Sequence, residues 1–165
     1  MRLSSMADYA VLTMTAAARH CGSGLLARPN GERRAMVSAA QLAEETGLPA
    51  PTVQKVVSKL SAAGLLKSVR GAGGGLKLAR PAAAISLADI VEAVEGPIAL
   101  TACVEAGRHD CTLEACCTLK PHWPVVNQAL RGALAGISLT QLSGRAPAMP
   151  IAPVPVVVIP EGVGA

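Results

Sequence analysis

The sequence predicts a mainly α-helical fold with one small β-hairpin. Apolar residues recur at helical spacing in several segments, and residues 65–80 alternate polar and apolar around a run of glycines. The chain has 165 residues, is 51% hydrophobic and contains only two aromatic residues, Tyr9 and Trp123. This length suits one domain with an extension, and its core must consist of Ala, Val, Leu and Ile.

The first part of the chain predicts three helices. Residues 5–20 carry apolar side chains on one side, and residues 22–34 form a loop rich in Gly and Arg. The second helix begins after Ser38, with Gln41 three residues on as in a capping box, and ends at Gly47. A turn with two prolines leads to the third helix, residues 51–63, whose first-turn proline needs no N–H partner.

Two short helices joined by a tight turn form a helix-turn-helix pattern. Residues 65–70 and 76–80 each alternate like a half-buried strand, and the glycines between them make a turn. A hairpin in this place is a wing, and residues 86–95 add another short helix. The sequence therefore predicts a winged helix-turn-helix DNA-binding domain over residues 1–98.

The second part predicts three further regions. Residues 99–122 form a cysteine-bearing loop, residues 123–143 a long C-terminal dimerisation helix, and residues 144–165 a proline-rich, disordered tail. The helix carries a small apolar stripe that consists of Val126, Ala129, Leu130, Ala133, Leu134 and Ile137. Because this stripe follows a complete domain, it is typical of a contact between subunits; packing on its own domain is the alternative.

Charge predicts a duplex nucleic acid as the partner. Residues 1–80 hold 11 Lys and Arg against 4 Asp and Glu, whereas the remainder is net acidic. The lack of aromatic side chains disfavours single strands, which are usually bound by stacking. Gln can pair with an adenine edge, and Lys and Arg can bind guanine or phosphate. The residues predicted to contact DNA are Arg2, Thr52, Gln54, Lys55, Ser58, Lys59, Arg70 and Lys77.

Four of the five cysteines lie between Cys103 and Cys117, an arrangement typical of metal ligation. The chain shows neither a secretion signal nor an apolar stretch long enough to span a bilayer, which predicts a cytoplasmic protein without membrane contact. Thiolates suit zinc or an iron–sulfur cluster, and the wide gaps between these cysteines favour the cluster. No nucleophile–base arrangement is evident, so the chain is not predicted to be an enzyme.

Several segments in fixed order resemble one family. They are MRLSSMADYA (residues 1–10), LPAPTVQK (48–55), VRGAGGG (69–75) and ISLADIVEAVEG (85–96). They resemble the iron–sulfur winged-helix transcriptional regulators that include IscR, NsrR and RirA. The segment EGPIALTAC (95–103) looks most like the branch that regulates the SUF cluster-assembly operon. The resemblance covers residues 1–142.

The resemblance implies a homodimer on a palindromic DNA operator and an iron–sulfur cluster, either 2Fe-2S or 4Fe-4S. It implies Cys103, Cys111 and Cys117 as ligands, because relatives leave five residues between the last two cysteines. Some relatives take the fourth ligand from a histidine three residues later, where this chain has Lys120. Others take it from an acidic residue at the place of Asp8, supplied by the partner subunit. His122 or Asp8 is therefore the candidate fourth ligand. Leu76 replaces the usual tyrosine of the wing.

The expected function is that of a repressor that senses cluster status and controls iron–sulfur assembly genes such as the SUF operon. The alternative is a winged-helix regulator that senses zinc or another thiol-binding metal through the adjacent pair Cys116 and Cys117. A redox enzyme that uses the same pair is a third class.

Overall fold

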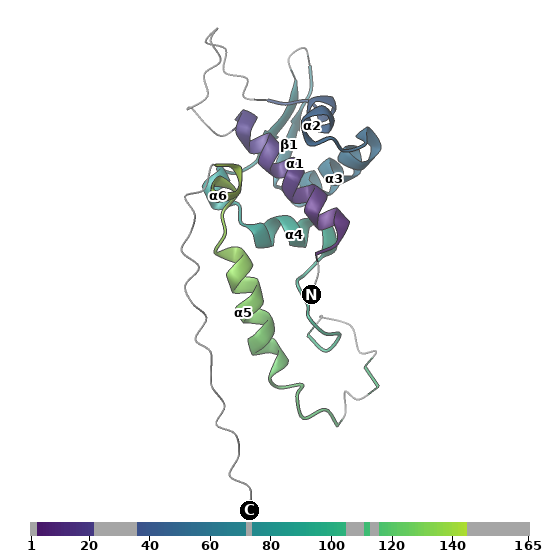
Figure 1. Cartoon of the computed structure of the whole chain (residues 1–165), viewed down its shortest axis with the longest axis vertical. Helices are drawn as coiled ribbons and strands as arrows, with labels where there is room; N and C mark the ends of the chain where they lie inside the picture. The colour runs from purple at the N-terminus through teal and green to yellow at the C-terminus, as the bar shows by residue number, and fades with distance from the viewer. Residues whose placement is uncertain (1–2, 22–35, 72–73, 105–110, 113–115, 145–165) are drawn as a thin grey trace, which may run out of the picture.

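The structure is a computed structural model that describes residues 3–21, 36–71, 74–104, 111–112 and 116–144 (Figure 1). Its elements are α1 (Ser5–Cys21), α2 (Ala39–Thr46), α3 (Ala50–Ala62), β1 (Leu66–Val69), β2 (Gly75–Leu78), a 3-10 turn (Ala82–Ala84), α4 (Leu87–Glu95), α5 (Trp123–Ala135) and α6 (Leu139–Ser143). The predicted mainly α fold with one hairpin is confirmed. The predicted loop at residues 22–34 and the predicted tail at residues 144–165, apart from Gly144, lie outside the described residues.

Local sequence signals explain the helix-turn-helix. Ser38 accepts a hydrogen bond from the N–H of Gln41, and the Gln41 side chain bonds back to the N–H of Ser38, which completes the predicted capping box. Gly47 ends α2 in the left-handed conformation, with φ 69°. In the first turn of α3, Pro51 occupies a position that needs no N–H donor. The two helices therefore begin and end for reasons contained in the local sequence.

The wing is a two-stranded antiparallel hairpin extended by one residue from the segment before α2. Leu66 pairs with Leu78 at one end and Val69 with Gly75 at the other. Val37 joins β2 through two hydrogen bonds with Leu76, at N···O distances of 3.0 and 2.8 Å. A Cβ on Gly74 would collide with the carbonyl oxygen of Val69, so this turn position requires glycine.

The core is built around α1. Its buried side chains are mostly alanines, which let the other helices approach the α1 backbone closely. Met14 fills the centre and has no exposed surface. The side chains that pack around α1 come from α2, α3, α4, the hairpin and α6, and they include Leu42, Val53, Leu60, Leu66, Ile90 and Leu139. Among the described residues, no helix has the length and apolar character needed to cross a lipid bilayer.

The C-terminal helical region differs from the prediction. The sequence predicts one helix over residues 123–143, but the structure has two, α5 and α6, interrupted after Ala135. The break has a local cause, because Ser138 forms a capping box with Gln141 and starts a new helix. Two backbone hydrogen bonds secure the break, from the N–H of Leu87 to the carbonyl oxygen of Ile137 at 2.8 Å and from the N–H of Leu139 to that of Ile85 at 2.7 Å.

Leu139 connects α6 to the core of the DNA-binding domain, since its side chain is completely buried beside Ile85. Replacing Leu139 with Ala is expected to lower the free energy of unfolding by about 2–5 kcal/mol, because truncation leaves a cavity. Urea denaturation followed by circular dichroism measures the change. Leu119→Ala is the matched control, since Leu119 is 58% exposed. Equal stability of the two variants would show that α6 contributes nothing to this core.

An ion pair joins α5 to α4. The guanidinium of Arg131 binds both carboxylate oxygens of Glu92, at 2.8 and 2.9 Å. The Arg131 hydrogen bonds lower the pKa of Glu92, with a smaller lowering effect from the N–H of Ile98. A lowered pKa means that this contact stabilises the fold above the carboxyl's ordinary pKa, and that the stabilisation is lost as the pH falls through the lowered value.

Candidate nucleic-acid interface and candidate metal centre

One face of α3 is free to meet a ligand. Val53, Val56 and Leu60 are buried against the core, and this orients the opposite face toward solvent. Most of the predicted contact residues are exposed there, while Thr52 is half-buried; the exposed ones are Gln54, Lys55, Ser58 and Lys59. An exposed amphipathic helix after a tight turn is the geometry of a recognition helix.

Lys59 differs from its neighbours on α3. Although its side chain is exposed, its ammonium group donates a hydrogen bond to the carbonyl oxygen of Val94 in the last turn of α4. A cation at this place also interacts favourably with the negative end of the α4 dipole. Lys59 therefore joins α3 to α4 in this structure, in addition to its predicted role at the DNA.

The wing adds positive charge beside α3. Arg70, directly after β1, is exposed, and so are Lys67 and Lys77. The strand register places Lys67 directly opposite Lys77. Like charges in opposed positions destabilise a hairpin unless an anion lies between or near them. The pair is therefore typical of a phosphate-binding surface. Lys67 was not among the residues predicted to contact DNA, although the register of the two predicted strands places it beside Lys77. Arg2 lies outside the described residues.

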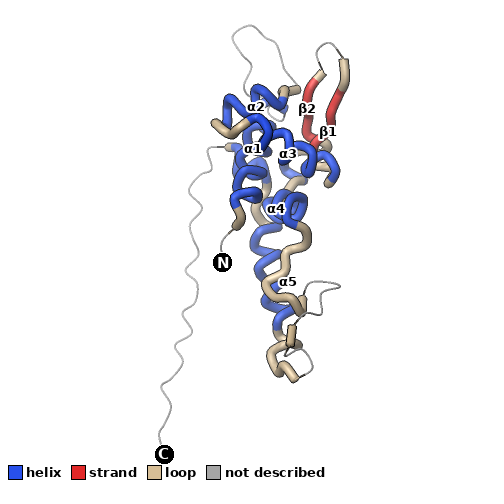
Figure 2. Tube along the Cα trace, turned by 90° about the vertical axis from the view of Figure 1, so that its right-hand side faces the viewer, coloured by secondary structure: helices blue, strands red, loops and turns tan. Residues whose placement is uncertain are grey.

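The hairpin and the cysteine region lie at opposite ends of the described structure. In Figure 2 the two strands project beyond the helices on one side, whereas the segment between α4 and α5 lies at the far end, beside the start of α5. The regions predicted to bind DNA and a metal are thus separated by the helical body.

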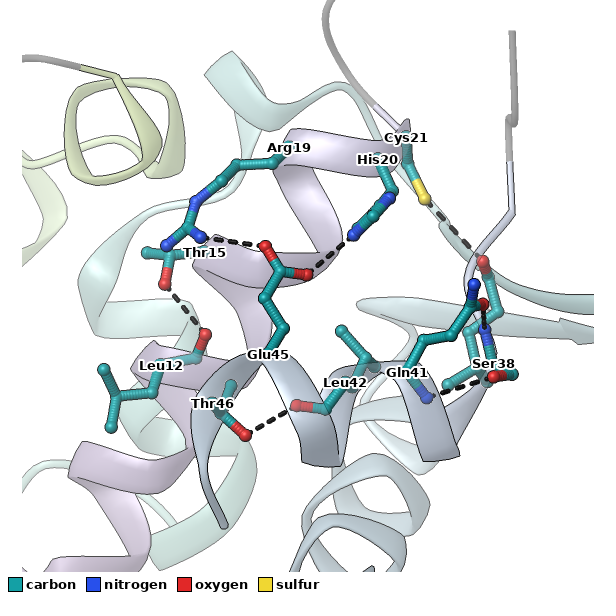
Figure 3. Close-up of polar contacts among 11 residues, drawn as sticks. Leu12, Thr15, Arg19, His20, Cys21, Ser38, Gln41, Leu42, Glu45 and Thr46 are labelled. Carbon is teal, nitrogen blue, oxygen red and sulfur yellow. Dashed lines mark hydrogen bonds and ion pairs between the residues drawn. The ribbon is translucent and has the colours of Figure 1, made fainter. Parts of the chain in front are cut away.

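Cys21 is separate from the other cysteines. It ends α1, and its thiol donates to the carbonyl oxygen of Leu76 across 3.6 Å (Figure 3). Burial raises the pKa of the Cys21 thiol, which keeps it protonated and makes it a poor metal ligand. The neighbouring Arg19 and His20 hold Glu45 of α2 at 2.9 and 2.7 Å (Figure 3). This corner of the molecule therefore holds α1, α2 and the hairpin together.

The other four cysteines lie in the segment between α4 and α5. Cys103 and Cys117 are half-buried, Cys111 and Cys116 are exposed, and none forms a disulfide. Cys103 sits in a turn closed by a hydrogen bond from the N–H of Val104 to the carbonyl of Thr101 at 3.1 Å. Its sulfur lies 3.1 Å from the hydroxyl oxygen of Thr101. Cysteine sulfurs outside disulfides are soft donors that suit soft metals.

The structure does not bring the predicted ligands into a closed site. Within the described parts of the chain, no three His, Cys, Asp or Glu side chains form a group that could hold a metal ion. Residues 105–110 and 113–115, which connect these cysteines, are not among the described residues. Asp8 is exposed in the first turn of α1, and exposed His122 directly precedes α5. The donor chemistry, soft thiols with an oxygen or imidazole candidate, fits an iron–sulfur cluster.

The helix α5 has an apolar face without a partner among the described residues. No residue of α5 is buried; its half-buried residues are Trp123, Asn127, Leu130 and Leu134, and the helix contacts α4. On another side, Val125 is 72% and Val126 47% exposed. Ala129 and Ala133 continue that face, one and two turns further along the helix. Large exposed apolar side chains in a continuous row indicate a contact with another molecule.

Known proteins are similar to this chain in both sequence and fold. A profile of the Rrf2 family, described as iron-dependent transcriptional regulators, matches residues 3–145. The transcriptional regulator IscR of Photorhabdus laumondii is 32% identical over 142 residues, which cover 86% of this chain and 79% of that protein. The structure of CymR, the global cysteine regulator of B. subtilis, matches with a TM-score of 0.62 and 26% identity, covering 87% of this chain and 96% of that chain.

The structure of IscR from T. potens matches with a TM-score of 0.59 and 29% identity, covering 86% of this chain and 85% of that chain. These relatives are transcriptional regulators rather than enzymes. The resemblance inferred from the sequence motifs is thereby confirmed at the level of the family and of its IscR-like members. Since the family profile matches most of its length, the chain belongs to the Rrf2 family and is a helix-turn-helix transcriptional regulator.

Proposed function

We propose that this regulator is a homodimeric repressor that senses iron–sulfur cluster status and controls cluster-assembly genes such as the SUF operon. One observation carries the proposal: four cysteines, none of them in a disulfide, lie in the segment between the winged helix and α5. Similarity to IscR and to a family described as iron-dependent supports it. The assignment of this chain to the branch that regulates SUF genes is a prediction from residues 95–103.

The DNA-binding end reads a duplex with α3 and the wing. The α3 helix enters the major groove, where Gln54 can form two hydrogen bonds with an adenine edge and Lys55 can reach guanine or phosphate. Lys67, Lys77 and Arg70 on the hairpin neutralise backbone phosphates. A second subunit repeats these contacts on the other half of a palindromic operator.

The sensing end consists of Cys103, Cys111 and Cys117, with Asp8 or His122 as the fourth ligand. These three thiolates would hold the cluster, and the cluster would supply a response to iron supply and oxidants. Holding it would restrain the three cysteines relative to one another. Cluster binding changes DNA affinity only to the extent that the cluster is more stable in one arrangement of the dimer than in the other.

A spectrum of the anaerobically purified protein tests this function. A brown protein with visible absorbance, iron and acid-labile sulfide is expected, and its affinity for duplex DNA from the promoter of the cluster-assembly genes should change when a chelator removes the iron. A colourless protein that still binds DNA would exclude the cluster. It would favour a thiol- or zinc-sensing regulator, the second candidate, which gains support from the structural similarity to CymR.

Gln54→Ala is expected to weaken operator binding by about 1–3 kcal/mol at each half-site and to relax the preference at one base position. Affinity for unrelated duplex DNA should stay unchanged, because the phosphate-binding side chains remain. Lys77→Ala provides the contrast: it should weaken binding to every sequence and lower the log–log salt slope by about 0.9 for each phosphate that it neutralises. Fluorescence anisotropy over a salt series measures both. Equal effects of Gln54→Ala on operator and unrelated DNA would contradict the assignment of α3 as the reading helix.

A further inference from the structure

Asn127, on α5, binds the backbone of the segment that follows α4. Its side-chain oxygen accepts a hydrogen bond from the N–H of Leu100 at 3.0 Å, and its side-chain nitrogen donates to the carbonyl oxygen of Ile98 at 2.8 Å. These two partners determine the orientation of the amide, because an N–H must meet the oxygen and a carbonyl must meet the nitrogen. Only a short primary amide supplies both a donor and an acceptor here, so Asn suits this position.

The same segment is tied to α4. The N–H of Ile98 points to a carboxylate oxygen of Glu92 at 3.5 Å, and Arg131 binds that carboxylate from α5. Asn127 and Arg131 are four residues apart and so lie on the same side of α5. Residues 98–100 are therefore held between two helices by three side chains, none of which is predicted to bind DNA or a metal.

Cys103 lies directly beyond this attachment. Only Thr101 and Ala102 separate it from Leu100, and the hydrogen bond between Val104 and Thr101 makes residues 101–104 a single turn. The position of the Cys103 thiol relative to α5 is thus set by the Asn127 hydrogen bonds. On the other side, the last turn of α4 accepts the Lys59 hydrogen bond at Val94, two residues after Glu92. One turn of α4 is therefore connected to α3, α5 and the cysteine segment.

We propose that Asn127 is a positioning residue that holds Cys103 in a fixed position relative to α5. Through the last turn of α4, it would couple a cluster bound by that thiolate to the recognition helix α3. This inference rests on the proposed function, since it concerns what the cluster does to DNA binding. An ordinary structural contact would affect only local order. A positioning residue must also change how long the cluster persists and how strongly it alters DNA affinity.

The test compares Asn127→Ala with Gln128→Ala, its exposed neighbour on α5. Alanine favours helix, so neither variant is expected to unfold. Asn127→Leu, which has a similar size, favours helix and removes both hydrogen bonds, replaces Asn127→Ala should that variant fail to fold. In cluster-free, reduced full-length protein, hydrogen exchange of the peptide containing Leu100 should accelerate by about tenfold in Asn127→Ala only, as expected when two hydrogen bonds are removed.

Two further measurements use the loaded protein. Cluster loss, followed as bleaching of the visible absorbance, should be faster in Asn127→Ala, and the ratio of DNA affinities of loaded and cluster-free protein should move toward one. Unchanged exchange at Leu100, or faster exchange with unchanged bleaching and an unchanged ratio, would overturn the inference while the proposed function stands. A parent protein that never acquires the chromophore would overturn the proposed function and the inference together.

Discussion

Serine in place of Cys103, Cys111 or Cys117 is expected to abolish the visible absorbance of the anaerobically purified protein. Each change removes a thiolate from the predicted ligand set, and a serine hydroxyl is a much poorer ligand for iron. Cys116→Ser is expected to keep the absorbance, since adjacent cysteines point in different directions and one cluster rarely uses both. Asp8→Ala or His122→Ala, whichever removes the fourth ligand, should leave a coloured protein with a shorter-lived cluster.

Cys21→Ser is the matched control for these variants. Its thiol lies beside Leu76 at the hairpin, away from the other four, and burial keeps its pKa raised. Iron and sulfide content and visible absorbance after anaerobic reconstitution would be measured for all five variants. Retention of the chromophore in every one of these variants would rule out Cys103, Cys111 and Cys117 as required ligands. Loss in Cys116→Ser with retention in Cys117→Ser would instead reverse the assignment within the pair.

The combined change of Val126 and Ala129 to Glu is expected to give a monomer that no longer binds the operator. These side chains lie on the exposed apolar face of α5 that has no partner among the described residues. A carboxylate forced into an apolar subunit contact loses its hydration without compensation, and this opposes association. Each monomer then holds only one half of the operator contacts.

Light scattering coupled to size exclusion would measure the mass, and anisotropy the operator affinity. Gln128→Glu serves as the control, because it adds negative charge to an exposed position on another side of α5. A dimeric mass for the double variant would show that α5 does not form the subunit contact. A monomer that still binds the operator with the parent's affinity would separate dimerisation from DNA binding.

The features that could be predicted from the sequence have local causes. The capping box at Ser38, the left-handed Gly47 and the glycine turn of the wing each depend on residues a few positions apart. Helical periodicity identified α5 but not its end, because the stripe continues in phase through Ile137 while the backbone turns at the Ser138 cap. A periodic pattern reports which face is apolar and says little about where a helix stops.

Contacts between distant segments were not predictable in this way. The bond of Lys59 to Val94 and the attachment of residues 98–100 by Asn127 join positions about thirty residues apart. The spacing of these partners follows no local pattern, and polar residues on an exposed helix are ordinarily solvated. The cysteine positions were evident from their spacing, whereas their relation to α4 and α5 depends on how those helices pack.

The return of the chain through α6 makes the DNA-binding unit discontinuous in sequence. Ile85 and Leu139 are adjacent in the core although more than fifty residues separate them, so the polypeptide from Gly96 to Gly136 is an insertion with both ends anchored in one folded body. Such a region can be exchanged as a unit where its contacts with α4, such as the ion pair between Arg131 and Glu92, are kept. Sensor regions could therefore be exchanged between relatives at these two boundaries, whereas a gene truncated before α6 would encode a DNA-binding unit with a hole in its core.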